Sequence, residues 1–140
     1  MHPEEYLPLV TVGGLVVAND GDILLLRSNK WKDHYHAPCG QVALGEKRED
    51  AFFREVKEAT CLDVINVQYV LTIDSIFSDE FWKKSHFVMH EYTSSLSDLQ
   101  DKTDVMLNDE INDFVWVPPA QAQKLPLTKE TKILLNWLLK

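Results

Sequence analysis

The pattern of apolar and polar positions predicts a strand pair, a loop and then a helix in the first half of the chain. Aliphatic and β-branched residues dominate Leu9–Ala18 and Asp22–Arg27, and Asn19-Asp20-Gly21 between them is a strong turn signal. Residues 28–40 are polar and aromatic and contain a proline, so we expect a loop there. From Glu49 to Thr60 the apolar residues recur with helical spacing and without Gly or Pro, which predicts an amphipathic helix of about three turns.

The second half of the chain predicts three more strands and a closing helix. The strands are expected at residues 63–77, 86–96 and 114–117. An acidic loop, residues 98–113, precedes the last strand, and residues 128–140 have a strongly apolar face with Thr128 as a candidate N-cap. The order β-β-α-β-β-β-α lacks the regular alternation of a doubly wound fold, so it favours a mixed sheet with helices on its faces.

Composition and charge narrow the class of partner. The 140 residues suit one domain, residues 1–140, with a substantial core. The formal net charge is −8, and an acidic surface argues against sequence-independent binding to long nucleic acids, which depends on Lys and Arg contacts to phosphate. It leaves open a small nucleotide whose phosphates are neutralised by a metal ion.

We expect a soluble, cytoplasmic protein, because the sequence shows no targeting signal and the cysteines show no pattern of disulfides. The first nine residues contain acids and prolines and no apolar segment of the kind found in signal peptides. No apolar run approaches the ~20 residues that a membrane-spanning helix needs. Cys39 and Cys61 have no metal-ligand spacing, which favours two reduced thiols over a disulfide.

The predicted helix carries the candidate chemistry. Arg54, Glu55 and Glu58 share one helix face, since residues three and four positions apart are neighbours there. Paired carboxylates on adjacent turns offer the hard oxygen ligands that Mg²⁺ and Mn²⁺ prefer. Taken alone, an E-x-x-E pair is more often a solvated helix face. Here Glu46 precedes the helix, and Gly40 allows close approach of the backbone to a ligand, which strengthens the metal-site interpretation.

The spacing of these residues resembles the Nudix box of the MutT-type Nudix hydrolase family. That box reads G-x5-E-x7-R-E-U-x-E-E-x-G-U, where U is aliphatic. This chain matches it at Gly40, Glu46, Arg54, Glu55, Val56, Glu58 and Leu62. The preceding strand pair, Pro38 and the "FVWVP" segment also fall where that family has counterparts, so the resemblance covers nearly the whole chain.

The resemblance implies an α+β fold: an α/β/α sandwich with a mixed sheet and a loop-helix-loop catalytic motif. It implies a Mg²⁺-dependent pyrophosphohydrolase (with Mn²⁺ as the alternative ion) that cleaves a phosphoanhydride bond in a nucleoside diphosphate-X or nucleoside triphosphate. Carried over residue by residue, Glu55 and Glu58 would be metal ligands and the Gly40 carbonyl a further ligand. Glu46 and Arg54 would complete the catalytic group, with Arg54 orienting a carboxylate.

Three positions depart from the family pattern. Ala59 stands where the second Glu of the usual pair is expected, and a methyl group can neither bind a metal nor take a proton. Cys61 replaces the usual Gly, and a different helix exit would accommodate it. Cys39 replaces a Gly just before Gly40, which is a milder change.

Another acid could compensate for Ala59. Glu110 is the first candidate, because it lies just before a strand where relatives of the family place an additional functional carboxylate. Asp109 and Glu91 are the next candidates. The alternative for Glu110 is a solvated acid in an acidic loop.

Substrate contacts are weaker signals. Arg27 ends the second strand, where the resemblance implies a basic residue facing phosphate, and His36 lies in the aromatic segment before the box. Each is also compatible with plain surface or core packing. His34 and His36 lack a third nitrogen or sulfur ligand, which argues against zinc. The apolar face of the last helix packs on its own sheet or on a second subunit, so a monomer and a homodimer both remain open.

Two main classes of function follow from these patterns, and a structural or partner-binding domain is a third. The first is an active Nudix-type hydrolase, supported by the intact Glu46, Arg54, Glu55 and Glu58. The second is a catalytically impaired Nudix-fold module that only binds a nucleotide, for which Ala59 is the motive. The group X and the general base are not determined by the sequence, because pocket residues outside the box select the substrate.

Overall fold

A computed structural model describes residues 7–140. The strands are β1 (Leu9–Val17), β2 (Ile23–Arg27), β3 (Tyr35–His36), β4 (Cys39–Gln41), β5 (Val64–Ile76), β6 (His86–Leu96) and β7 (Asp113–Val117). The helices are α1 (Arg48–Thr60), α2 (Pro119–Ala122) and α3 (Lys129–Leu138). Single 3-10 turns lie at Asn29–Trp31 and Lys102–Asp104.

The seven strands form one mixed sheet. The order along its main path is β3-β2-β1-β6-β5, with β4 also pairing with β1 and β7 with β2. β1 and β6 run parallel, from the pair Leu9 and Phe87 to the pair Val17 and Ser95, whereas the other strand pairs are antiparallel. The mixed sheet that the sequence predicts is therefore confirmed.

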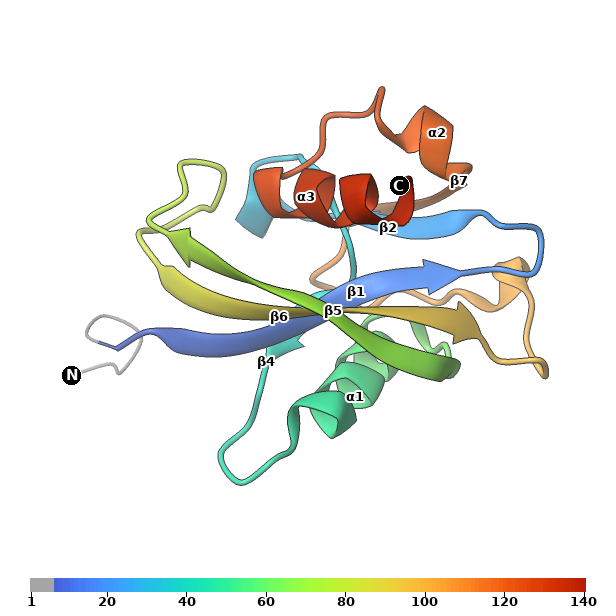
Figure 1. Cartoon of the computed structure of the whole chain (residues 1–140), viewed down its shortest axis with the longest axis horizontal. Helices are drawn as coiled ribbons and strands as arrows, with labels where there is room; N and C mark the ends of the chain where they lie inside the picture. The colour runs from blue at the N-terminus through green and yellow to red at the C-terminus, as the bar shows by residue number, and fades with distance from the viewer. Residues whose placement is uncertain (1–6) are drawn as a thin grey trace.

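Helices cover both faces of this sheet, which confirms the α/β/α arrangement. In Figure 1, α1 lies below the sheet, and α2 and α3 lie above it. Alternate residues of β1 serve the two layers, because successive side chains of a strand point to opposite faces. Val12 and Val16 pack in the cluster that contains Phe52 of α1, and Leu15 packs in the cluster that contains Leu134 of α3.

Most predicted elements are confirmed within a residue or two of their ends, and residues 28–40 are the exception. The prediction of a plain loop there is wrong, because the segment contains β3 and β4. β4 pairs with Thr11–Gly13 of β1, and β3 pairs with the end of β2. Both strands are only two or three residues long and exist through pairing with other strands, so local composition gives no sign of them.

The structure bears on the predictions about the N-terminal segment, membrane-spanning helices and cysteines. Residues 1–6, which hold most of the segment predicted not to be a signal peptide, lie outside the described residues. In the rest of the chain, no helix has the length and apolar character needed to cross a membrane. Cys39 and Cys61 are free thiols.

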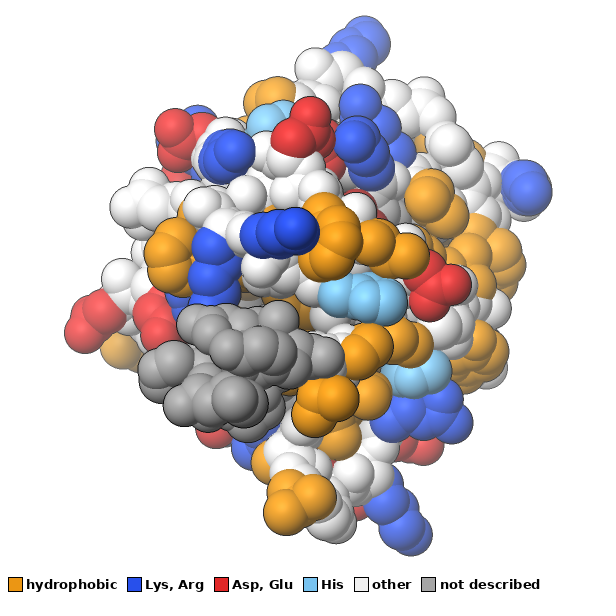
Figure 2. Space-filling view, turned by 90° about the vertical axis from the view of Figure 1, so that its left-hand side faces the viewer, with side chains coloured by type: hydrophobic (Ala, Val, Ile, Leu, Met, Phe, Trp, Pro, Cys, Tyr) orange, Lys and Arg blue, Asp and Glu red, His pale blue; other side chains and the backbone are white. Residues whose placement is uncertain are grey.

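One end of the molecule departs from the acidic average. At the connection between β5 and β6, Lys83 lies 5.1 Å from the ring centroid of Trp82, and Lys84 lies 4.5 Å from that of Phe77. Both aromatic residues are exposed. Figure 2, which faces this end, shows hydrophobic and basic side chains next to one another. The net charge of the chain therefore does not describe every surface.

Candidate active site

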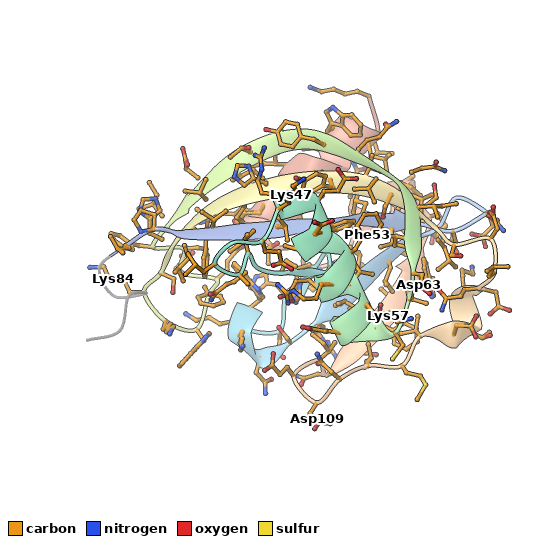
Figure 3. The ribbon with its side chains drawn as sticks, turned by 90° about the horizontal axis from the view of Figure 1, so that it is seen from below. Lys47, Phe53, Lys57, Asp63, Lys84 and Asp109 are labelled. Atoms are coloured by element: carbon orange, nitrogen blue, oxygen red, sulfur yellow. The ribbon has the colours of Figure 1, made fainter. Side chains whose placement is uncertain are left out.

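Helix α1 presents the predicted acids beside the sheet. Phe52 and Val56 are fully buried against the sheet, which turns the charged residues of α1 toward its edge and the preceding loop. Figure 3 shows the helix from below, running from Lys47 past Phe53 and Lys57 toward Asp63. The helix begins without a side-chain cap, and Glu49 and Asp50 in its first turn face the positive end of its dipole.

Arg54 joins the predicted carboxylates into one network. Its Nε and Nη2 donate to the two oxygens of Glu46, each at 2.9 Å, which is a bidentate pair. Its Nη1 donates to Glu55 Oε1 at 2.8 Å and to Glu58 Oε2 at 3.2 Å. Nη2 also donates to the carbonyl of Gln41 at 2.9 Å. One guanidinium thus fixes the loop, both helix acids and the strand end relative to one another.

The pairing keeps Glu46 ionised. Hydrogen bonds from Arg54, and then from the backbone N–H of Ala43, lower the pKa of Glu46 to about 2. The same contacts, with Glu46 as the largest, raise the pKa of Arg54. Both groups are therefore charged at neutral pH, which is the state in which a bidentate pair is strongest.

Gly40 and Glu55 are in close contact. A Cβ atom on Gly40 would lie 2.0 Å from both Cδ and Oε2 of Glu55, so the carboxylate occupies the space that any other residue would fill. Partial burial is the largest influence on Glu55 and raises its pKa, while Arg54 opposes this. Gly40 is thus needed for the position of Glu55, which the sequence alone did not reveal.

The donors fit a hard divalent cation. Arg54 engages one oxygen of Glu55 and one of Glu58, and the second oxygen of each accepts no hydrogen bond from residues 7–140. The backbone of Gly40 lies against the Glu55 carboxylate. Within the same residues, no group of three or more His, Cys, Asp or Glu side chains is arranged as a metal-ligand set. Glu55, Glu58 and the Gly40 carbonyl therefore remain the predicted ligands.

Ala59 is buried beneath the acidic loop. It is 7% exposed and belongs to the core cluster between α1 and the sheet. The loop closes over it: Asn108 N donates to the Ala59 carbonyl at 3.2 Å, and Met106 N donates to the Thr60 carbonyl at 2.9 Å. A small side chain at this position suits the packing of the loop against the helix.

The same loop carries Glu110 toward the box. Glu110 lines the same cavity as Glu55 and pairs with Lys30 at 3.5 Å. Asp109, the neighbouring candidate, is exposed and points out from the loop (Figure 3). Glu110 is exposed as well, and the difference between these two adjacent acids is that Glu110 lines the cavity and Asp109 does not.

A cavity of about 330 Å³ adjoins the box, between the sheet and α3. Its volume lies in the range of small-molecule sites in proteins. The box contributes Gly40, Gln41 and Glu55, and the residues farther in include Trp31, His36, Phe81, Phe87, Met89, Glu91, Glu130 and Thr131. The cavity therefore runs from the charged network to an apolar and acidic interior.

The two predicted substrate contacts differ in position. His36 lines the cavity, is buried, and contacts the Ala37 carbonyl at 2.8 Å and the Ser28 hydroxyl at 3.2 Å. Burial lowers its pKa to about 4, so it is neutral at pH 7. Arg27 is not among the described residues that line the cavity and pairs instead with Asp113 at 3.5 Å. Substrate contact stays a prediction for both.

Glu91 and Glu130 are the site residues that the sequence ranked low or missed. Both are buried and line the cavity, Glu91 from β6 and Glu130 from α3. Glu91 was only a lower-ranked candidate, although it alternates with Phe87 and Met89 and so shares their buried face. Nothing local in the sequence distinguishes Glu130 from a helix acid in solvent.

The comparison with known families agrees with this geometry. The family model described as "NUDIX domain" matches residues 7–138. Among curated relatives, the chain is 30% identical over 121 residues to the NAD-capped RNA hydrolase NudC of Pseudomonas putida, an alignment that covers 85% of this chain. The chain spans only 40% of the length of that relative.

Solved structures have the same fold. A MutT NUDIX hydrolase from Burkholderia pseudomallei superposes with a TM-score of 0.76 at 23% identity, covering 94% of this chain and 98% of the other. The NUDIX domain of Shewanella oneidensis NrtR, solved with ADP ribose, superposes with a TM-score of 0.78 at 18% identity, covering 99% and 92%. At such identities the likeness concerns the fold.

Proposed function

The chain belongs to the NUDIX domain family, and we propose from this premise that it is a hydrolase of nucleotide phosphoanhydrides. The proposed substrate is a nucleoside diphosphate linked to a group X, or a nucleoside triphosphate, met as a small molecule in the cytoplasm. One observation carries the proposal: Arg54 holds Glu46, Glu55 and Glu58 together, and Glu55 faces a cavity large enough for a nucleotide moiety.

Glu55, Glu58 and the Gly40 carbonyl would hold Mg²⁺, with Mn²⁺ as the alternative. When bound, such an ion polarises phosphoryl oxygens and supplies an activated water. The chain's own contribution is to place the two carboxylates: Arg54 orients them, and Glu46 fixes Arg54. Glu46 thus acts through Arg54, as a positioning residue.

We assign to Glu110 the role of the carboxylate that Ala59 cannot provide. Its support is its place on the wall of the cavity that Glu55 also lines. Lys30, which pairs with Glu110, is a cation at the same wall and suits contact with substrate phosphate. Neutral His36 would contact the substrate inside the cavity, and Arg27 would contact phosphate after leaving Asp113.

The test is turnover with Mg²⁺ or Mn²⁺ across a substrate panel: nucleoside triphosphates, dinucleoside polyphosphates, ADP-ribose, NAD, nucleotide sugars and a NAD-capped RNA. We expect phosphate, pyrophosphate or nucleotide release that falls by about 100-fold or more in Glu55→Gln and Glu58→Gln. Glu49→Gln is the matched control, because Glu49 is exposed on the same helix and outside the network. Absence of release from every substrate would contradict the proposal.

The second candidate is a nucleotide-binding module without catalysis. Ala59 favours it, because the box has one carboxylate fewer than the family pattern. It predicts nucleotide binding by calorimetry with no product formed, even for the best ligand in the panel. Measured turnover that depends on Glu55 would exclude it.

A further inference from the structure

Two buried acids, Glu91 and Glu130, line the cavity. Glu91 stands on the sheet and is 7% exposed, and Glu130 stands on α3 and is 8% exposed. They lie in the two layers that enclose the cavity. The negative charge of Glu130 adds to the rise in the pKa of Glu91. Neither belongs to the Arg54 network, so the proposed chemistry leaves both without a role.

Each acid has an oxygen without a partner. Glu91 Oε2 and Glu130 Oε1 are buried and make no hydrogen bond within residues 7–140. Leaving a buried polar atom unsatisfied is costly, and such atoms are few in native proteins. Because both residues line the cavity, a ligand inside it can supply hydrogen-bond donors to these carboxyl groups.

The backbone makes room for one of these carboxylates. Gly13 of β1 pairs with Glu91 of β6 across the parallel ladder. A Cβ atom at Gly13 would lie 3.0 Å from Glu91 Oε2 and also 3.0 Å from the Pro38 carbonyl. A side chain at position 13 would therefore press on the carboxylate, so the glycine keeps the space in which it stands.

The remaining wall suits a flat ring. Trp31 and Phe81 have ring centroids 4.6 Å apart, and Phe81 meets Phe87 edge-on at 5.0 Å. Met89 packs in the same apolar cluster as Trp31 and Phe87. An aromatic and thioether surface of this kind binds planar heterocycles by stacking and dispersion.

The charge state of the pair favours a neutral donor over a metal ion. Burial raises the pKa of Glu91 to about 7, and Glu130 adds to this effect. Burial also raises the pKa of Glu130. The pair therefore carries less than its full negative charge at neutral pH, which weakens any attraction for a divalent cation.

We propose that Glu91 and Glu130 form a recognition site for the amino-bearing edge of a purine base, whose exocyclic amino group donates to their carboxyl oxygens. The base lies against Trp31 and Phe87, and its phosphates extend toward Glu55 and Lys30. This proposal rests on the proposed function, because it names the substrate class of the same cavity. It adds that the enzyme distinguishes bases by an amino group.

Three nucleoside monophosphates test this without any hydrolysis, since they contain no phosphoanhydride bond. AMP and IMP differ by an amino or oxo group at position 6, and GMP differs from IMP only by its 2-amino group. We expect the wild-type protein to bind AMP or GMP at least about tenfold more tightly than IMP in calorimetric titrations. Glu91→Leu and Glu130→Leu should reduce that ratio to within about twofold.

Matched variants separate recognition from folding. Glu91→Gln retains one acceptor oxygen at the same position and should keep part of the preference, whereas Asp74→Asn, an exposed acid on β5, should keep all of it. Thermal unfolding checks that each variant is folded. The proposal is overturned if the wild type binds the three nucleotides equally, or if its preference survives in both leucine variants.

Turnover distinguishes this proposal from the one on which it rests. If the protein cleaves nucleotides without preference among bases, the recognition site is wrong and the proposed function stands. If Glu91→Leu lowers kcat equally for every base with KM unchanged, Glu91 acts on the chemistry and the recognition role is also wrong. If no nucleotide is bound or cleaved, both proposals fail.

Discussion

Two groups of acids meet at one cavity, which Glu55 of one group and Glu91 and Glu130 of the other line, and the two groups differ in how their charge is compensated. Glu46, Glu55 and Glu58 share the guanidinium of Arg54, so a cation compensates their charge. Glu91 and Glu130 are buried, and each has an oxygen that accepts no hydrogen bond within residues 7–140. We refer to them as the outer acids and the inner acids.

The difference shows that burial and pairing set ionisation in opposite directions. Pairing with Arg54 lowers the pKa of Glu46 to about 2, whereas burial raises that of Glu91 to about 7. Glu46 is therefore held as a carboxylate beside Arg54, whereas Glu91 offers hydrogen-bonding oxygens in an apolar setting. One cavity can thus provide separate regions for phosphate chemistry and for recognition.

The largest effect should come from adding a carboxylate at a buried position that has no cation beside it. Ala59→Glu restores the family pattern but puts a carboxylate where the loop at Met106 and Asn108 closes on α1. We expect a loss of about 4 kcal/mol in the free energy of unfolding, measured by chemical denaturation, because the buried charge has no partner. Ala59→Ser is the control, and a gain in turnover without loss of stability would contradict this prediction.

Removing an inner acid should change how the free energy of unfolding depends on pH, because burial shifts the pKa of that acid. With a folded pKa of about 7 and an ordinary value of 4.5, Glu91 holds a proton in the folded state that the unfolded chain releases between these values. The native state therefore loses stability as pH rises from 4.5 to 7, by about 3 kcal/mol in total. Relative to wild type, Glu91→Gln should gain stability by that order between pH 5 and 8. A pH-independent difference would show that Glu91 is not shifted.

Displacing one outer acid should affect activity more than folding. Gly40→Ala places a Cβ atom on the Glu55 carboxylate, which can swing away because it is the end of a flexible side chain. We expect a loss of about 100-fold in kcat/KM with little change in melting temperature, since small misplacements at a catalytic centre are costly. Gly21→Ala is a comparison for stability alone, because a Cβ atom there meets no other residue, while the φ of 91° makes the substitution cost stability through the backbone.

The smallest effect should come from a substitution at Cys61, which belongs neither to the outer acids nor to the inner acids. Cys61 ends α1 with φ of 63°, the left-handed conformation, and its N–H donates to the Lys57 carbonyl. The expectation that a different exit accommodates the cysteine is wrong, since it adopts the conformation that the family's glycine would. Cys61→Gly should raise the free energy of unfolding by about 1 kcal/mol and leave turnover unchanged. Loss of stability in Cys61→Gly would show that the left-handed conformation of Cys61 is not strained.

The sequence predicted the outer acids because their spacing is local. Arg54, Glu55 and Glu58 share one helix face by the geometry of the helix itself, and the fixed distances to Glu46 and Gly40 identify the box. The mixed sheet with helices on its faces was predicted from apolar periodicity and the order of the elements, which depend on neighbours a few residues away.

The inner acids could not be predicted with the same certainty. Glu130 reaches the cavity only because α3 packs across the sheet, and Glu91 only because β6 pairs beside β1. The short strand β4 was missed for the same reason, since it pairs with β1, and β3 was missed because only two of its residues pair with β2. Contacts between remote segments decide these features, and no local pattern records them.

The parallel ladder between β1 and β6 has a consequence for how the molecule forms. β5 and β6 are neighbours in sequence and can pair as a local hairpin, whereas Leu9 must find Phe87 across most of the chain. Closing so long a loop is slow compared with local pairing. We therefore expect the box helix to form early and the Gly13–Glu91 junction to assemble late, so a refolding chain should regain helical signal before it regains any preference for a base.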